Sequence, residues 1–275
     1  MPTDASFRSK YGPYALVAGA AVGLGAEYAR QIAALGIGLV LIDRDAAPLA
    51  ATADAIRKQH GVDVQTLDAD LGSADVAQRV RAGLGGAEIG LLVYNAAIGT
   101  VAPYLEMTPA LADATIDVNC RGPLRLVHEL VPAMVARGRG GVILMSSMSG
   151  NFGSAQLTVY AASKAFTLVF GDALWSELAP QGVDVLVVQP GSTRTPGWLS
   201  SQPSEPGAEI MPAMDPAEVV REALATLGVE PRVIPGDANK QGAELLGQIP
   251  RRQAVEMMSA ITWKLVRNDK PRETR

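Results

Sequence analysis

Two residues of this sequence, Tyr160 and Lys164, have types and a spacing that could support proton transfer. They fall at the start of a segment with helical periodicity, so both side chains leave the same face of the predicted helix. A free phenol has a pKa of about 10, and a neighbouring ammonium favours the ionised phenol and lowers that pKa. Tyr160 is therefore a candidate acid or base, although Tyr-x-x-x-Lys pairs also occur on helix surfaces as solvated contacts.

Two further polar residues are candidates for the same site. The apolar run from Gly141 to Met145 predicts a buried strand, and Ser147 follows its end. A serine there could hold the oxygen of a substrate carbonyl or alcohol where the phenol can reach it. Asn119 lies among apolar residues in a predicted helix, where it is either a satisfied internal hydrogen-bonding group or one that disturbs the helix and turns towards a site.

A glycine-rich turn near the start of the chain predicts a phosphate site. The apolar run Tyr14 to Ala18 predicts a buried strand, Gly19, Gly23 and Gly25 follow, and a helical pattern then runs to Leu35. Glycines let the backbone turn tightly and approach a pyrophosphate, and the amide groups at the amino end of the helix meet its charge.

Two acidic residues are predicted on the adenosine side of such a site. Asp43 ends the second predicted strand, from 38 to 42, where a dinucleotide-binding fold places the acid that binds the ribose hydroxyls. Its charge would repel a 2′-phosphate, which favours NAD over NADP, although Arg44 could compensate a phosphate. Asp70 follows the third predicted strand and is either a residue beside the adenine or a solvated turn residue.

Strand and helix patterns alternate along most of the chain. Further strands are predicted at 62–67, 89–94, 141–145, 183–188 and 233–235, and further helices at 46–59, from the cap Ser73 to 84, at 109–137, 158–178 and from the capping box at Asp215 to 227. This alternation predicts an α/β fold, a doubly wound Rossmann-type parallel sheet with helices on both faces, in a single domain spanning 1–275. Gly19, Asp43, Asn95, Ser147 and Pro190 all follow strands and therefore share one edge.

Composition limits the classes of function. The net charge of -4 and the 48% hydrophobic content indicate a compact soluble protein and argue against a nucleic-acid partner. We expect no signal peptide and no transmembrane segment. A lone cysteine, Cys120, excludes an internal disulfide and fits a cytoplasmic location. With only two histidines besides, we expect no metal site.

Six motifs in order and spacing resemble those of the short-chain dehydrogenase/reductase family between Tyr14 and Thr195. They are the turn Ala18-Gly19-Ala-Ala21-Val-Gly23-Leu24-Gly25, the stretch Tyr94-Asn95-Ala96-Ala97, Asn119, Ser147, the motif Tyr160-Ala-Ala-Ser163-Lys164, and Pro190-Gly191 with Thr195.

The resemblance implies hydride exchange between the nicotinamide and the carbinol carbon of an alcohol. Tyr160 would be the acid or base, Lys164 would lower its pKa and hold the nicotinamide ribose, Ser147 would steady the substrate oxygen, and Asn119 would anchor a water. The cofactor would bind to Gly19, Ala21, Gly23, Leu24, Gly25, Asp43, Arg44, Asp70, Leu71, Asn95, Ala96, Tyr160, Lys164, Pro190, Gly191, Thr193 and Thr195.

Two positions depart from the family pattern. Ala18 replaces a threonine whose hydroxyl typically bonds the Asn-Asn-Ala-Gly stretch, and that stretch is itself altered at Tyr94 and Ala97. Ala97 adds a methyl where backbone usually passes close to the cofactor. Because both partners of one contact differ from the family pattern, we interpret the two changes as compensating for each other.

Three loops at the predicted edge carry large apolar residues and few charges. They predict a pocket for a lipophilic secondary alcohol or ketone, such as a steroid, although these side chains could instead pack the loops down. The loop at 192–214 is a predicted lid over the substrate. The apolar residues are Val101, Tyr104, Leu105, Phe152, Trp198, Leu199, Ile210 and Met211.

The last part of the chain predicts a helical extension at 250–267. Ala254, Met258, Ile261 and Leu265 form an apolar stripe with basic residues on its flanks. Such a helix docks on its own domain or on a second subunit, or else lies on a membrane surface. The family resemblance also implies a homodimer or homotetramer.

Three functions are compatible with the sequence: an NAD-dependent alcohol dehydrogenase or ketone reductase, a nicotinamide-sensing binding protein without turnover, and a scaffold. The first is favoured because a sensor has no need of serine, tyrosine, lysine and asparagine together. The glycines of the phosphate turn argue against the scaffold.

Overall fold

A seven-stranded sheet forms the centre of the computed structural model, which describes residues 4–201 and 213–266. All the paired strands run parallel in the order β3-β2-β1-β4-β5-β6-β7. The predicted fold class is confirmed. The strands are β1 (Tyr14–Ala18), β2 (Gly38–Asp43), β3 (Val64–Asp68), β4 (Ile89–Tyr94), β5 (Gly140–Met145), β6 (Val183–Val188) and β7 (Arg232–Val233).

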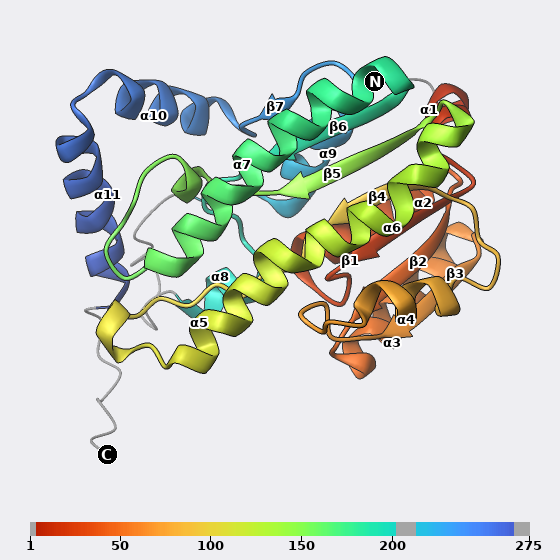
Figure 1. Cartoon of the computed structure of the whole chain (residues 1–275), viewed down its shortest axis with the longest axis horizontal. Coiled ribbons are helices and arrows are strands. Elements are labelled where there is room, and N and C mark those ends of the chain that lie inside the picture. Colours follow the sequence, from red (N-terminus) through yellow and green to blue (C-terminus); the bar gives the residue numbers. More distant parts are fainter. Residues whose placement is uncertain (1–3, 202–212, 267–275) are drawn as a thin grey trace.

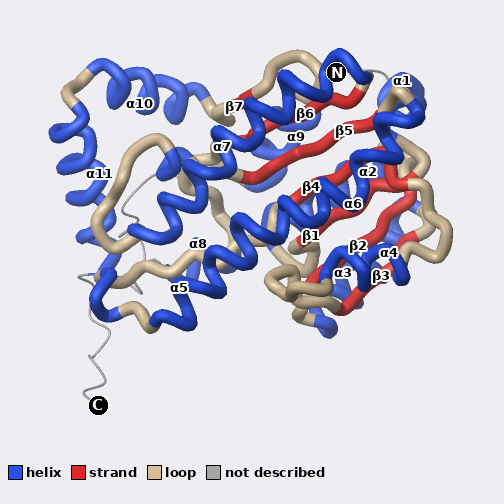
Figure 2. The backbone as a smooth tube through the Cα atoms, in the orientation of Figure 1, coloured by secondary structure: helices blue, strands red, loops and turns tan. Residues whose placement is uncertain are grey.

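Helices cover both faces of the sheet (Figures 1 and 2). One face carries α2 (Gly23–Ala34), α3 (Ala46–His60) and α9 (Pro216–Thr226). The other carries α4 (Val76–Gly83), α6 (Gly122–Arg137) and α7 (Thr158–Leu178). The remaining helices are α1 (Asp4–Tyr11), α5 (Pro109–Ile116), α8 (Pro196–Ser201), α10 (Asp237–Gln248) and α11 (Arg251–Val266). No helix among the described residues is both long and apolar enough to cross a membrane.

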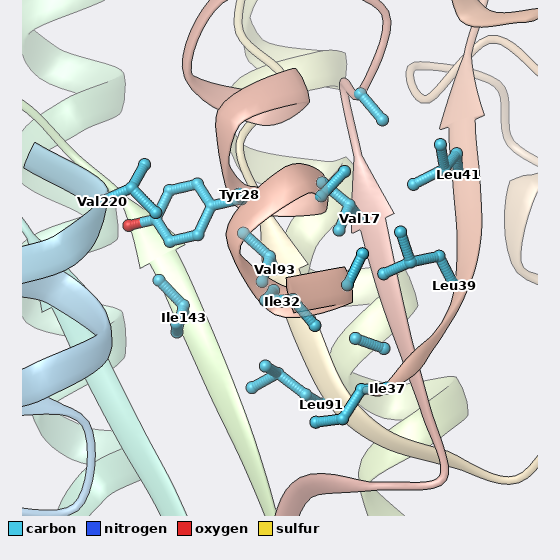
Figure 3. Close-up of a cluster of buried hydrophobic side chains, with 14 of the residues drawn as sticks. Val17, Tyr28, Ile32, Ile37, Leu39, Leu41, Leu91, Val93, Ile143 and Val220 are labelled. Atoms are coloured by element: carbon cyan, nitrogen blue, oxygen red, sulfur yellow. The ribbon is translucent and has the colours of Figure 1, made fainter. Parts of the chain in front are cut away.

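Tyr28 fixes α2 on the sheet (Figure 3). Its ring is fully buried in the apolar cluster that includes Val220 of α9 and Ile143 of β5. Its hydroxyl donates to the sulfur of Met145 at 3.4 Å, so the polar atom is not left alone in the core. The amino end of α2, which carries the glycine turn, is thereby held against the carboxyl ends of the strands.

The long helix predicted at 109–137 is interrupted. The structure has α5, a π-helical segment (Asp117–Arg121) and α6 in its place, with Asn119 inside the π segment. The N–H of Gly122 donates to the carbonyl of Asp117, one residue farther back than in an α-helix. The sequence pattern misses this break because apolar periodicity continues across it.

Smaller differences concern the ends of elements. Ser73 is not the cap of α4, because the helix starts at Val76 with Asp75 at its N-cap and the Ser73 hydroxyl donates to the Asp75 carboxylate. The third strand starts at Val64 rather than Val62, since its pairing with β2 begins there. The last strand is confined to Arg232–Val233.

Three helices were not predicted: α1, α8 and α10. In α1, Phe7 and Tyr11 are buried and the Tyr11 hydroxyl donates to Asp184 at 2.5 Å, which attaches this helix to β6. The helix α10 leads into α11, and the two form an arm beside the sheet (Figure 1). Of the predicted lid, Thr193 pairs with Met214 and α8 lies between them, while 202–212 lie outside the described residues.

Candidate active site

The glycine turn between β1 and α2 has the backbone that a phosphate cradle needs. The N–H groups of Gly19 and Ala20 both donate to the Ile42 carbonyl, at 2.8 and 3.1 Å. Gly19 has φ +81, and a Cβ there would lie 2.7 Å from the backbone of Ala96. A Cβ on Gly25 would overlap the carbonyl oxygen of Gly19. The turn can therefore pack this tightly only because these residues lack side chains.

Asp43 lies at the end of β2 beside this turn. Its carboxylate accepts from the N–H of Ala21 at 3.0 Å and from the N–H of Asp45 at 3.2 Å. Asp70 also accepts from Gly72, at 2.9 Å, so it is a turn residue and a pocket residue at once. The acidic side chains thus stand where the sequence predicts them.

A pocket of about 350 Å³ opens along the carboxyl edge of the sheet. Ten of its residues belong to the predicted cofactor set: Gly19, Gly23, Leu24, Asp43, Arg44, Asp70, Leu71, Asn95, Ala96 and Thr195. Eight were missed, although adjacency to predicted residues could have identified most of them: Val22, Asp45, Ala69, Ala97, Ile98, Val118, Pro196 and Gly197. The glycine turn, the acidic side chains and the open groove of this pocket fit a dinucleotide.

Several residues predicted to bind the cofactor do not line this pocket. Ala21 and Gly25 are buried behind the turn, and Pro190 is buried after β6. Gly191 and Thr193 belong to the loop after β6, where the Thr193 hydroxyl donates to the Gly191 carbonyl at 3.1 Å. Direct cofactor contacts of these residues stay predictions.

Tyr160 and Lys164 lie on one face of α7, as predicted. The Lys164 ammonium is 5.5 Å from the centre of the Tyr160 ring. It donates to the carbonyl of Met145 at 2.7 Å, and the carbonyl of Lys164 itself accepts from the Ser146 hydroxyl at 2.8 Å. Lys164 is therefore attached to the end of β5 through both its side chain and its main chain.

The expected direction of the Tyr160 pKa is wrong for the protein alone. Burial raises the pKa of the phenol, and a hydrogen bond with Ser147 opposes this only in part. Burial also lowers the pKa of Lys164 to about 8, so the amine is a weaker source of positive charge than a solvated lysine. Tyr160 is consequently protonated near neutral pH and suited to donate a proton to a ketone oxygen.

Ser147 is placed by a short 3-10 turn, Met148–Gly150, that follows β5. Its oxygen accepts from the N–H of Ser149 at 3.2 Å and from the Ser149 hydroxyl at 3.0 Å. With these two bonds accepted, the hydrogen of Ser147 is left to donate to the phenol or to a substrate oxygen.

Asn119 is a satisfied internal hydrogen-bonding group, the first alternative, and it lies in a helix that the π segment disturbs. Its carbonyl oxygen accepts from the N–H of Ile98 at 2.8 Å, and its amide nitrogen donates to the Ile98 carbonyl at 3.0 Å and to the Ser163 hydroxyl at 2.9 Å. Ser163 belongs to the Tyr-x-x-Ser-Lys motif on α7. The π segment thus fastens the loop after β4 to the helix that carries Tyr160.

Tyr94 stabilises this π segment. The π-register partner of the Val118 carbonyl is Pro123, which has no N–H to offer. The buried Tyr94 hydroxyl donates to that carbonyl instead, at 2.6 Å. A Cβ on Gly122 would collide with the same hydroxyl. Tyr94, which stands where the Asn-Asn-Ala-Gly stretch has its first asparagine, therefore stabilises the π segment in this protein.

Ala18 is accommodated by main-chain bonds. The N–H groups of Asn95 and Ala96 donate to the Ala18 carbonyl at 3.0 and 2.9 Å. The Asn95 side chain also donates to the Gly19 carbonyl at 2.8 Å. These contacts hold the two loops together without a threonine hydroxyl, and Ala97 lies exposed at the pocket.

The substrate side is bordered by the arm α10–α11. Ala254 and Thr262 of α11 are buried, so this helix docks on its own domain, the first of the predicted alternatives. Val101, Phe152 and Trp198 are partly buried, whereas Tyr104, Leu105 and Leu199 are exposed. Ile210 and Met211 lie outside the described residues.

Comparison with known proteins agrees with this geometry. A family model described as short chain dehydrogenase matches residues 13–205. A 7beta-hydroxysteroid dehydrogenase of Collinsella aerofaciens is 35% identical over 237 residues, which cover 86% of this chain and 90% of the relative. A very-long-chain 3-oxoacyl-CoA reductase of Anas platyrhynchos is 34% identical, over 80% of this chain and 70% of the relative.

Solved structures give the same result. A structure of a 7beta-hydroxysteroid dehydrogenase superimposes with a TM-score of 0.87 at 32% identity, covering 92% of this chain and 98% of the other. A short-chain dehydrogenase of Sphingobium yanoikuyae in complex with NADPH has a TM-score of 0.73 at 30% identity, covering 87% and 96%. This protein belongs to the short-chain dehydrogenase family.

Proposed function

We propose that the protein is an NAD-dependent oxidoreductase that interconverts a lipophilic secondary alcohol and its ketone. The observation that carries the proposal is the convergence of Tyr160, Lys164, Ser147 and Asn119 beside the glycine-turn pocket. A protein that only sensed the dinucleotide would not need an acid–base pair next to a serine that is free to donate.

The residues divide the chemistry as follows. A bound nicotinamide would supply or accept the hydride. Tyr160 gives its proton to the ketone oxygen in reduction and takes it back in oxidation. Ser147 donates a hydrogen bond to the same oxygen and keeps it within reach of the phenol. Asn119 keeps Ile98 and Ser163 in place and anchors a water for proton relay.

Asp43 favours NAD over NADP. Two backbone N–H groups orient its carboxylate at the pocket, and Asp45 and Asp70 add negative charge nearby. A 2′-phosphate would meet this charge with only Arg44 to offset it. We expect Asp43→Ala to weaken NAD binding and to narrow the preference against NADP; a preference for NADP in both forms would contradict this assignment.

The substrate proposed is of the hydroxysteroid type. The support is the similarity to hydroxysteroid dehydrogenases and to a bulky-bulky ketone specific alcohol dehydrogenase of Comamonas testosteroni, 27% identical with a TM-score of 0.74. The lightly packed loop with Tyr104 and Leu105 exposed is consistent with a large apolar ligand.

The active form proposed is a homodimer or homotetramer in the cytoplasm. Exposed apolar side chains on α6 and α7, Leu124, Val169 and Trp175, support self-association through this face. Val169→Glu would then shift the sedimentation coefficient towards that of the monomer, whereas an unchanged value would exclude this face.

Turnover with NAD and a panel of steroid and other secondary alcohols tests the proposal, followed by the absorbance of reduced nicotinamide. Tyr160→Phe should lower kcat by about 10²–10⁴ while NADH still binds. Tyr14→Phe is the matched control and should keep full activity, because Tyr14 starts β1, at the end of the strand away from the glycine turn, and its hydroxyl donates to Asp63 at the surface. NADH binding without turnover of any alcohol or ketone would favour the sensor instead.

A further inference from the structure

Gln156 has an unusual combination of burial, strain and missing partners. Only 3% of its surface is exposed, and both its Oε1 and Nε2 atoms are buried without a hydrogen-bond partner. Its φ is +67, and no other non-glycine residue of the described part of the chain has a positive φ. Both features cost stability, so they persist only where the surrounding structure enforces them.

The neighbours of Gln156 hold this conformation from two sides. The N–H of Ala155 donates to the Ser259 hydroxyl at 2.9 Å, and the Ala155 carbonyl accepts from Thr262 at 2.8 Å. The carbonyl of Gln156 accepts from the N–H of Ala102 at 2.9 Å. The arm helix α11 and the loop after β4 therefore fix the backbone on both sides of the strained residue.

The same loop connects Gln156 with the acid–base site. Ile98 is bonded to Asn119, a Cβ on Gly99 would lie 3.5 Å from the Tyr160 ring, and Ala102 is bonded to Gln156. Residues 98–102 of this loop therefore lie next to both the acid–base site and Gln156. Gln156 also precedes Tyr160 by four residues, immediately before α7. The main chain of Gln156 is therefore bonded to the loop that lies against the Tyr160 ring.

A carboxamide offers one acceptor oxygen and two N–H donors. A hydroxyl group, which both donates and accepts, complements it better than a carboxylate or an apolar group. The covering loop carries Tyr104 and Leu105, which are 57% and 94% exposed, so it is lightly packed and can be displaced by a ligand.

We propose, building on the proposed function, that Gln156 is a specificity-determining residue whose carboxamide hydrogen-bonds a second hydroxyl of the substrate, remote from the reacting carbon. The chain then selects lipophilic ketones that carry an additional hydroxyl over their deoxy analogues. The unpaired amide is the stability cost of that selectivity, because polar groups placed to bind a ligand lack partners until it arrives.

Gln156→Met tests the proposal with ketosteroids matched in pairs, with and without a second hydroxyl. We expect kcat/KM to fall about 10–100-fold for the hydroxylated member and to stay within about twofold for the other. The thermal midpoint should rise, because an unpaired buried amide is removed. A fall in the midpoint, or an equal loss of kcat/KM for both members, would overturn the proposal in favour of a bound water or a packing role.

Gln189→Met is the matched control for stability. Gln189 is equally buried, at 3% exposed, but its Nε2 donates to Asn151 at 3.0 Å, so its loss should lower the midpoint. Ligand-induced shifts of the midpoint, measured for both steroids, separate this proposal from the proposed function. If no ketone turns over, the proposed function is wrong. The role of Gln156 would still be supported if the hydroxylated steroid raised the thermal midpoint more than its deoxy analogue did and Gln156→Met abolished this difference.

Discussion

The dinucleotide side and the substrate side of this site are built in opposite ways. On the first, the Asn95 side chain donates to the Gly19 carbonyl and the N–H of Ala21 donates to the Asp43 carboxylate, so these polar groups are paired. On the second, Gln156 is strained and unpaired, and its backbone is held by residues of α11 more than a hundred positions away in sequence. The comparison indicates that the dinucleotide side is pre-organised, while the substrate side retains strain.

The difference also concerns how each side is covered. The glycine turn follows strand β1, which pairs with β2, and the central residues of both strands are buried, so the turn cannot shift without disturbing the sheet. The substrate side is covered by a loop with exposed apolar residues and by an arm. The described contacts of this arm with residues 154 and 155 are hydrogen bonds that involve the side chains of Ser259 and Thr262. Substrate binding therefore has more freedom to remodel its surroundings than dinucleotide binding has.

Gly25→Ala should produce the largest effect and confine it to the dinucleotide side. The added Cβ would overlap the Gly19 carbonyl and lie 2.7 Å from the Asn95 amide nitrogen. The turn can relieve about 3 kcal/mol of overpacking only by moving away from the phosphate position, so we expect a roughly 100-fold loss of NADH affinity, measured by fluorescence titration. Gly247→Ala on α10, where a Cβ meets open space, is the control. Equal losses in both variants would contradict the rigidity of the turn.

Gly122→Ala and Tyr94→Phe test the π segment, which lies between the dinucleotide side and the substrate side. Gly122→Ala should cost about 1–3 kcal/mol through collision with the Tyr94 hydroxyl. Tyr94→Phe should cost about 1–3 kcal/mol, because the Val118 carbonyl loses its donor. In the double variant the collision with the hydroxyl is gone, while the Leu71 carbonyl oxygen stays 2.8 Å from the added Cβ, so urea unfolding should show less than the sum of the two losses. Strict additivity would mean that the two residues do not share this contact.

Removal of the α11 hydroxyls should weaken the substrate side alone. With Ser259→Ala and Thr262→Val together, we expect about 1 kcal/mol of lost stability per hydrogen-bonded group and a several-fold higher KM for a bulky ketone. The dinucleotide affinity should not change. Met257→Ala, on the exposed side of the same helix, is the control. A loss of dinucleotide affinity in the double variant would show that the two sides are not separate.

The pH dependence should show the smallest change. Since the Tyr160 pKa lies above its ordinary value, ketone reduction should stay level through neutral pH and fall only as alkaline pH removes the proton, while alcohol oxidation should rise with pH. Ser147→Ala removes a bond that lowers this pKa, so the rising limb of oxidation should move to higher pH. A shift to lower pH would reverse the assigned direction.

The sequence predicts the glycine turn and the acidic residues of the pocket because their signals are local. Glycines, the acid after β2 and the alternation of strands and helices each involve a few neighbouring residues. The tyrosine and lysine pair follows from helical spacing in the same way. The pKa direction at Tyr160 was wrong because the extent of burial depends on the packed structure and not on the spacing of two residues.

The other features could not be predicted because they depend on distant contacts. The π segment needs Tyr94 of β4, which the pattern around Asn119 does not show. The arm α10–α11 meets the loop before α7 through Ser259 and Thr262, which no periodicity links to Ala155. The strain at Gln156 follows from this meeting, since glutamine itself does not prefer a positive φ.

The double attachment of Lys164 to β5 has an evolutionary consequence. The Ser146 hydroxyl donates to the Lys164 carbonyl, and the Lys164 ammonium donates to the Met145 carbonyl. These two bonds fix the position of the proton-transfer groups relative to the strand. Mutations in the neighbouring loops can then change which molecules are accepted without disturbing the chemistry. A site of this kind can acquire new substrates through successive substitutions in the loops alone.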